Sequence, residues 1–166
     1  MFLYLVRHAI AGEHDPARWP DDRERPLTPE GEKKFRQAAR GLQALVPTVD
    51  VVLSSPLVRA WQTALILHKT AGWPEPRRCE ALGLANPADV VDALQPHASA
   101  QSIALVGHEP SLHELASFLL SGDAAEVRMT MRKGSVACLQ CADPPRAASA
   151  DLEWLLQPRI LRSLAG

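Results

Sequence analysis

Three short apolar runs in the sequence are each followed by residues that can hold or attack a phosphoryl group. Arg7 and His8 follow the first run, Arg59 lies a few residues after the second, and Gly107 and His108 follow the third. A phosphoryl group in transfer carries negative charge on three oxygens, which planar guanidiniums bind well, and an imidazole can attack its phosphorus. These residue types therefore point to phosphoryl chemistry.

His8 is the candidate nucleophile of this set. A neutral ring nitrogen can attack phosphorus in line and give a phospho-imidazole, which water then cleaves. Arg7 and Arg59 would bind the phosphate, and their positive charges are expected to lower the His8 pKa so that the ring stays neutral. His108 would donate a further hydrogen bond to the same oxygens.

A metal centre is the alternative use of such side chains. Candidate ligands are present at His8, His14, Asp15 and His108, but they lack the tight spacing that is typical of metal ligands. Since fixed cationic side chains can neutralise the phosphoryl charge, no metal and no cofactor is expected.

The strands that position these residues are indicated by the hydrophobic pattern. Residues 2–6, 49–53 and 103–106 are apolar with little alternation, which is typical of strands covered on both faces. Further short strands are predicted at about 77–79, 134–140 and 152–156.

Helices are predicted between these strands. Thr28-Pro29 provides a capping residue followed by proline, and Ser55-Pro56 repeats this start for a second helix that runs to about Ala71. Shorter helical patterns cover residues 87–94 and follow Pro110.

Strand and helix alternate through most of the chain, which predicts an α/β fold. We expect a three-layer sandwich in which helices cover both faces of a mainly parallel central sheet. Ligands bind at the carboxyl ends of such strands, so Arg7-His8, Arg59 and His108 would meet at one edge. At 166 residues the chain is expected to form one domain, residues 1–166.

Residues 9–27 are rich in proline and charge, and they are predicted to form a long loop. Loops of this length in small domains are often functional. The sequence leaves open whether Trp19 and Arg25, within this loop, line the site or only border it.

The overall charge argues against several classes of protein. Eighteen basic and nineteen acidic residues give a formal charge of -1, unlike the strongly basic surface of a nucleic-acid binder. No signal-peptide pattern and no membrane-spanning apolar stretch is evident, so we expect a cytoplasmic protein without membrane contact. No exposed apolar seam is apparent either, which favours a monomer.

Three cysteines, Cys79, Cys138 and Cys141, are an odd number and argue against a disulfide framework. Cys138 and Cys141 lie three positions apart in a predicted strand, where they would face opposite sides. They are expected to be simple thiols rather than a metal or redox pair.

Four segments of the chain resemble the signature segments of the histidine phosphatase superfamily, and more closely those of its small bacterial phosphohistidine phosphatases of the SixA type. In chain order they are Leu5-Val6-Arg7-His8-Ala9, Arg25-Pro26-Leu27-Thr28-Pro29-Glu30-Gly31, Ser54-Ser55-Pro56-Leu57-Val58-Arg59-Ala60-Trp61-Gln62-Thr63-Ala64 and Val106-Gly107-His108-Glu109-Pro110. Ala9 stands where the wider superfamily usually has glycine.

The resemblance implies a phosphoglycerate-mutase-like fold and a metal-independent phosphatase. It implies that His8 accepts the phosphoryl group, that Arg7 and Arg59 bind it, and that His108 is the second histidine of the pocket. Glu80 corresponds to the position from which many relatives supply a proton donor.

The resemblance also bears on the substrate. Larger relatives insert long segments between the third strand and the second pocket histidine, whereas only residues 81–107 lie between Glu80 and His108 here. The implied function is removal of phosphate from a phosphohistidine on a phosphotransfer (signalling) protein, through a covalent intermediate. Two alternatives remain: a phosphatase of a small phosphoester or phosphoanhydride, and a phosphate-binding module without turnover.

Overall fold

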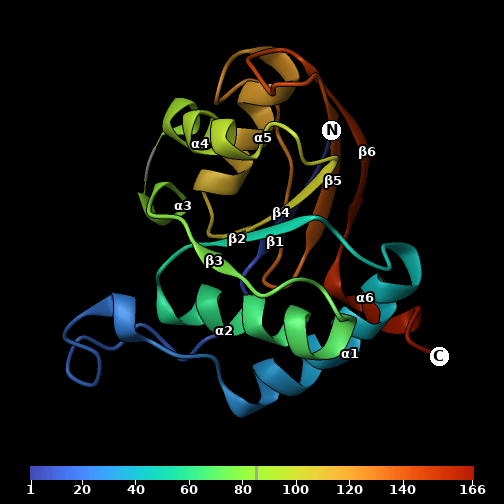
Figure 1. The fold of residues 1–166 in the computed structure, drawn as a ribbon. Coiled ribbons are helices and arrows are strands. Elements are labelled where there is room, and N and C mark those ends of the chain that lie inside the picture. The colour runs from blue at the N-terminus through green and yellow to red at the C-terminus, as the bar shows by residue number, and fades with distance from the viewer. Residues whose placement is uncertain (85) are drawn as a thin grey trace.

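A mixed sheet forms the central layer of the molecule. The computed structural model describes residues 1–84 and 86–166, and within these residues six strands form one sheet in the order β3-β2-β4-β1-β5-β6 (Figure 1). The strands are β1 Phe2–Arg7, β2 Val51–Ser54, β3 Arg77–Arg78, β4 Ser102–Gly107, β5 Val136–Cys141 and β6 Ala150–Leu156. Strands β3, β2, β4 and β1 run parallel, while β5 is antiparallel to both of its neighbours.

Helices cover both faces of this sheet, as the sequence predicts. They are α1 Pro29–Leu45, α2 Val58–Ile66, α3 Ala81–Leu84, α4 Pro87–Leu94, α5 Ser111–Ser121 and α6 Pro158–Ser163. Figure 1 shows α1, α2 and α6 on one face and α3, α4 and α5 on the other. The predicted α/β sandwich with a mainly parallel sheet is therefore confirmed.

Alternating strand residues supply two separate apolar cores. Val6 and Ala104 pack with α1 and α2, whereas Leu5 and Leu105 pack with α4 and α5. Each strand of the parallel centre is thus apolar on both faces, which explains why its sequence lacks the alternation of a half-exposed strand.

Capping residues define several helix ends. The Thr28 hydroxyl accepts a hydrogen bond from the Gly31 N–H at 2.9 Å before α1, and the Asn86 side chain accepts one from the Asp89 N–H at 3.1 Å before α4. The helix predicted to start at Ser55-Pro56 instead begins at Val58 and continues through a π-helical turn to Ala71. None of the described helices combines the length and hydropathy needed to cross a bilayer.

Candidate active site

The pairing of β1 with β4 brings the two histidines together. Arg7 lies opposite Gly107 in the parallel register, and the His8 N–H donates to the Gly107 carbonyl at 3.0 Å. The next residue on each strand points into the same space: the rings of His8 and His108 are 5.1 Å apart, centroid to centroid. Both side chains are buried, each 6% exposed.

His8 is held in a neutral state suited to nucleophilic attack. Its Nδ1 lies 2.6 Å from the Ala9 carbonyl oxygen, which can only accept, so Nδ1 carries the proton and Nε2 keeps its lone pair. The His8 pKa is lowered to about 3, mainly by burial; the hydrogen bond to the Ala9 carbonyl opposes the shift, and the charges of His108, Arg59 and Arg7 add to it. The expected effect of the arginines is present, but burial is the larger cause.

Ser55 fixes the orientation of His108. The Ser55 hydroxyl accepts a hydrogen bond from the Leu57 N–H at 3.3 Å and lies 2.8 Å from His108 Nε2. The hydroxyl can therefore donate its own hydrogen bond to that ring nitrogen. The other nitrogen, Nδ1, then carries the hydrogen as a donor. Burial, followed by the Arg59 charge, lowers the His108 pKa to about 4.

Two arginines border the pair of histidines. Arg7 ends β1, and its Nη1 donates to the Met131 carbonyl. Arg59 is the second residue of α2, so it lies near the positive end of that helix dipole. Its Nη1 donates to the Asp22 carbonyl at 2.8 Å, and its Nη2 lies 3.2 Å from Asp22 Oδ2.

Polar atoms without a partner are concentrated at this place. Among the described residues, the buried side-chain atoms that have no hydrogen-bond partner are Arg7 Nε, Arg59 Nε, His108 Nδ1 and Glu109 Oε1. Burying a donor without an acceptor is costly, and such atoms are rare in folded proteins. Three donors of this kind, from three distant segments of the chain, are available to the oxygens of an anion.

Asp22 is a site residue that the sequence did not reveal. Its carboxylate accepts from Arg25 Nε at 2.7 Å and lies 3.0 Å from His14 Nδ1, in addition to its contact with Arg59. The hydrogen bond from Arg25 holds the Asp22 pKa well below its usual range. Asp22 lies in the long loop after His8, and the length of this loop was the only sequence signal for a residue of the site. Arg25, which bonds Asp22, lies at the border of the site.

Thr63 is a second residue that sequence reasoning missed. Its hydroxyl accepts from the Ala9 N–H at 3.0 Å and donates to the Arg59 carbonyl at 2.7 Å. The residue is fully buried in α2. It therefore connects the end of β1, next to the candidate nucleophile, to the helix that carries the second arginine.

Glu109 belongs to the same surroundings. It follows His108 directly, and burial raises the pKa of its carboxyl group although the nearby Arg7 charge opposes the shift. Glu109 lies within a recognised sequence segment, but nothing in the residue pattern singles it out. In the structure it is the acidic neighbour of Arg7.

Glu80 lies apart from these contacts. It is exposed and lines a depression of about 180 Å³ together with Arg23, Pro56, Leu57 and Gly83. Within the described residues, its carboxylate forms no hydrogen bond or ion pair with another side chain. A role for Glu80 as proton donor stays a prediction.

The alternative metal centre is not assembled in the part of the chain that the structure describes. No group of three or more His, Cys, Asp or Glu side chains there is arranged to hold a metal ion. His14, one member of the alternative set, pairs with Asp22 instead. Cys138 and Cys141 are buried thiols whose neighbours lie on opposite faces of β5.

Comparison with known proteins agrees with this fold. The profile of the histidine phosphatase superfamily (branch 1) matches residues 3–83. An uncharacterised protein of Picosynechococcus sp. (strain ATCC 27264 / PCC 7002 / PR-6) is 32% identical over 159 residues, which cover 94% of each chain.

Two solved structures extend the likeness to the whole fold. The protein histidine phosphatase SixA, solved with tungstate, has a TM-score of 0.84 at 23% identity and covers 97% of this chain and 99% of its own. The alpha-ribazole phosphatase of Shigella flexneri has a TM-score of 0.74 at 18% identity, covering 95% and 97%. The chain belongs to the histidine phosphatase superfamily, and its class is that of a phosphatase.

Proposed function

We propose that this phosphatase removes phosphate from a phosphohistidine side chain of a phosphotransfer protein, through a covalent phosphohistidine at His8. The observation that carries the proposal is the meeting of two buried, neutral imidazoles, 5.1 Å apart, with two guanidiniums that keep unpartnered donors. Such a site supplies a nucleophile and the cationic donors that an anionic phosphoryl group requires.

The proposed reaction has two steps. In the first, the substrate ring takes a proton from solvent on its free nitrogen, and His8 Nε2 attacks phosphorus while the bond between phosphorus and that ring breaks, so the ring departs as neutral imidazole. In the second, water attacks phospho-His8, the bond from phosphorus to Nε2 breaks, and phosphate leaves with neutral His8 restored. Arg7, Arg59 and His108 hold the phosphoryl oxygens in both steps, so no metal ion is required.

The nature of the leaving group supports a phosphohistidine substrate. An imidazole has a pKa near 6.5, so it departs with far less help from a proton donor than an alkoxide does. Glu80, the predicted donor, is exposed and outside the contacts of the site. A site of this kind fits an easily expelled leaving group better than a phosphoester.

Access to the site supports a protein substrate. The chain between Glu80 and His108 forms α3, α4 and β4, and their apolar residues pack into the core that also contains the apolar residues of α5. This segment therefore serves the fold rather than covering the site. The likeness to SixA agrees with the proposal.

A small phosphoester or phosphoanhydride is the second candidate substrate, which the likeness to an alpha-ribazole phosphatase favours. Both candidates use the same four residues, so the structure of the phosphoryl site serves either. They differ in whether a protein surface beside the phosphoryl group contributes to binding.

Replacement of the nucleophile tests the proposal. His8→Gln should lower phosphate release from a phosphohistidine protein by roughly a thousandfold or more and abolish acid-labile labelling of the enzyme. His97→Gln, on a short turn after α4, is the matched control and should keep both. All assays are run both with and without a chelator.

Four results would contradict the proposal. Hydrolysis retained by His8→Gln would exclude the assigned nucleophile, and loss of wild-type activity with chelator would exclude a metal-independent reaction. A larger kcat/KM for a panel of small phosphoesters than for phosphohistidine would favour the second candidate. Phosphate binding without release would indicate a binding module.

A further inference from the structure

A groove lined by basic residues adjoins the candidate active site, with which it shares Arg7. It has a volume of about 720 Å³, and its basic residues are Arg7, Lys34, Arg132, Lys133, Arg159 and Arg162. The remaining lining residues include Ile10, Pro158 and Ile160, and no lining residue is acidic. We call this surface the basic groove.

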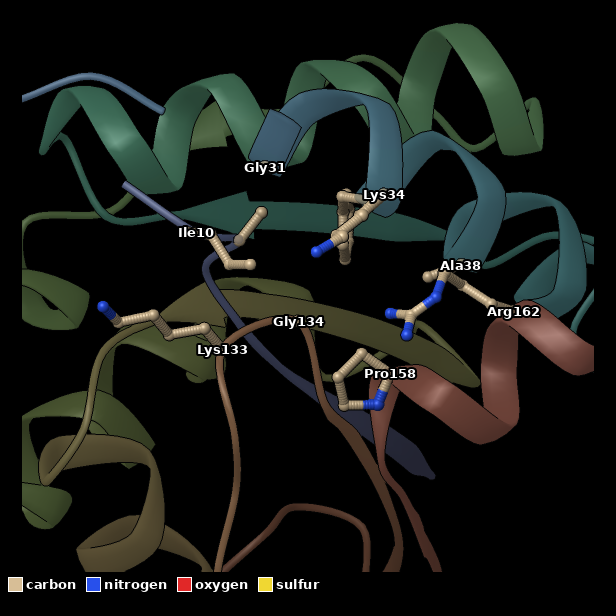
Figure 2. Close-up of a pocket in the computed structure, with 10 residues that line it drawn as sticks. Ile10, Gly31, Lys34, Ala38, Lys133, Gly134, Pro158 and Arg162 are labelled. Atoms are coloured by element: carbon tan, nitrogen blue, oxygen red, sulfur yellow. The ribbon is translucent and has the colours of Figure 1, made fainter. Parts of the chain in front are cut away.

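Figure 2 shows a smaller pocket that shares five of its lining residues with the basic groove. Lys34 extends from α1, Arg162 from α6 and Lys133 from the loop before β5, around the apolar side chains of Ile10 and Pro158. Together with the end of β1, which carries Arg7, four separate parts of the chain bring positive charge to the basic groove. The whole sequence, in contrast, has a formal charge of -1. The groove is a local feature and does not reflect a basic protein.

The loop that carries Arg132 and Lys133 is bonded directly to the candidate active site. The Gly134 N–H lies 3.1 Å from the Arg7 carbonyl and 3.0 Å from the His8 carbonyl. On the other side, Gln157 donates to the Thr130 carbonyl at 2.6 Å and accepts from the Ser135 hydroxyl at 2.8 Å. The groove is thus built on fixed elements and includes a residue of the phosphate clamp.

Most of the charges in the groove have no acidic partner. Within the described residues, no carboxylate lies within ion-pair distance of Arg132, Lys133, Arg159 or Arg162, while Lys34 pairs with Glu30 at 2.6 Å. A concentration of unneutralised positive charge attracts and orients an acidic surface.

Apolar residues distinguish the basic groove from a site for a simple anion or for nucleic acid. Ile10 is 37% exposed and Ile160 is 47% exposed, and both are among the large hydrophobic residues that the fold leaves open to solvent. Arginine is enriched at protein interfaces, whose buried centres are apolar, whereas nucleic-acid sites rely on phosphate contacts and aromatic stacking.

We propose that the basic groove docks an acidic, partly apolar face of the protein whose phosphohistidine is hydrolysed. Docking would place the phosphorylated side chain over His8, because Arg7, which lines the groove, directly precedes His8 in the chain. This inference rests on the proposed function, since it identifies the partner that the same site would serve. It assigns partner selection to α6 and the loop before β5, which lie outside the phosphoryl site.

A pair of synthetic peptides provides the probe. Both peptides carry one central phosphohistidine and two leucines. They differ only in the flanking residues, which are Asp and Glu in the acidic peptide and Asn and Gln in the neutral peptide. The enzyme variants are the double change Arg132→Glu with Arg159→Glu, and Lys69→Glu as a control in the π-helical turn that follows α2. Arg159 is the second residue of α6, where an acidic residue favours the helix dipole, so the variant should fold.

Two measurements are made. The first is the ratio of kcat/KM for the acidic and neutral peptides, and the second is direct binding of the unphosphorylated peptides by fluorescence anisotropy. The wild type and Lys69→Glu should prefer the acidic peptide by about tenfold or more in both, and the double variant should lose that preference.

The outcomes separate this inference from the proposed function. Equal hydrolysis of both peptides would keep the function and overturn the basic groove. Selective binding of the acidic peptide that is lost in the double variant, without hydrolysis of either peptide, would support the groove and reject the function. Tighter binding of a single-stranded oligonucleotide than of the acidic peptide would overturn the choice of partner.

Discussion

His8 and His108 are buried histidines whose surroundings keep them uncharged. Their pKa values are lowered to about 3 and about 4, mainly by burial. A neutral His8 is available as a nucleophile across the physiological range, and His108 can still donate through Nδ1. The cost of this arrangement is paid in stability when the solution becomes acidic.

The pH dependence of stability follows from these two shifts. In the unfolded chain both histidines bind a proton near pH 6.5, whereas in the folded chain they do so only near 3 and 4. The unfolded state therefore binds more protons between these values, and the free energy of unfolding falls as pH drops from about 6.5 towards 4. Each histidine should cost about 2 kcal/mol at pH 5.

Denaturant unfolding at pH 7 and pH 5 measures this effect. The double variant His8→Gln with His108→Gln should lose less stability over that interval than the wild type. His97→Gln should behave like the wild type. Equal losses in all three proteins would contradict the assignment of the shifts to the buried pair.

The Asp22 carboxylate would compete with a bound anion for Arg59. Its carboxylate lies 3.2 Å from Arg59 Nη2 and places negative charge beside the clamp. Asp22→Asn keeps the shape and the backbone contact to Arg59 but removes that charge, so inorganic phosphate should bind more tightly, by about threefold to tenfold. Isothermal titration measures the affinity, with Asp15→Asn in the same loop as control; unchanged or weaker binding would show that Asp22 acts only by positioning.

At the scale of elements, the contact between α1 and α6 supports one wall of the basic groove. Gly41 on α1 faces the backbone of Leu161 on α6, and a methyl group there would collide with the Leu161 carbonyl. The absence of a side chain therefore allows the two helices to approach. Arg159 and Arg162 depend on this approach for their place in the groove.

Substitution of Gly41 tests this contact because two physical effects have opposite signs. Alanine in place of glycine within a helix usually stabilises by about 1 kcal/mol. At Gly41 the collision should dominate, so Gly41→Ala should destabilise by ~1–3 kcal/mol. Gly83→Ala in α3, where the nearest atom would be 3.9 Å away, is the matched control and should not destabilise; thermal unfolding distinguishes the two.

The elements were predicted best where local chemistry defines them. The Thr28 and Asn86 side chains cap α1 and α4, and α4 covers the predicted residues 87–94. The start of α2 was predicted too early: the Ser55 hydroxyl bonds the N–H of Leu57, one residue before the helix begins at Val58, and it also contacts His108. That contact joins residues 53 positions apart, and no local pattern contains it.

The same distinction applies to the candidate site. Arg7, His8, Arg59 and His108 could be grouped from the sequence because each follows a strand of a parallel sheet, and the structure brings them together. Asp22 could not, since a long loop has no periodicity that fixes where its side chains point. Their catalytic roles await the experiments described above.

At the scale of the whole molecule, the distribution of charge matters more than its sum. The formal charge is -1, yet one groove contains six basic residues and no acidic ones. An acidic substrate would therefore be attracted to one side of a nearly neutral protein. Dissolved salt screens such attraction and reduces the distance over which it acts.

Ionic strength should consequently affect the two peptide substrates differently. Raising NaCl from about 50 mM to about 500 mM shortens the screening length several-fold, so kcat/KM for the acidic phosphohistidine peptide should fall by about tenfold. The neutral peptide should change far less, because only its phosphoryl group is attracted. Steady-state assays at several salt concentrations measure both, and parallel slopes would contradict long-range attraction by the groove.

The Thr63 hydroxyl has a consequence for how proteins of this design can change over time. One oxygen atom links the backbone next to His8 with the backbone of Arg59, in the buried centre of the fold. The separation of these two residues is therefore set by a pair of short internal bonds and is independent of the outer helices and loops. A lineage can replace most of its surface, and with it the molecules it recognises, while the distance on which its chemistry depends stays the same.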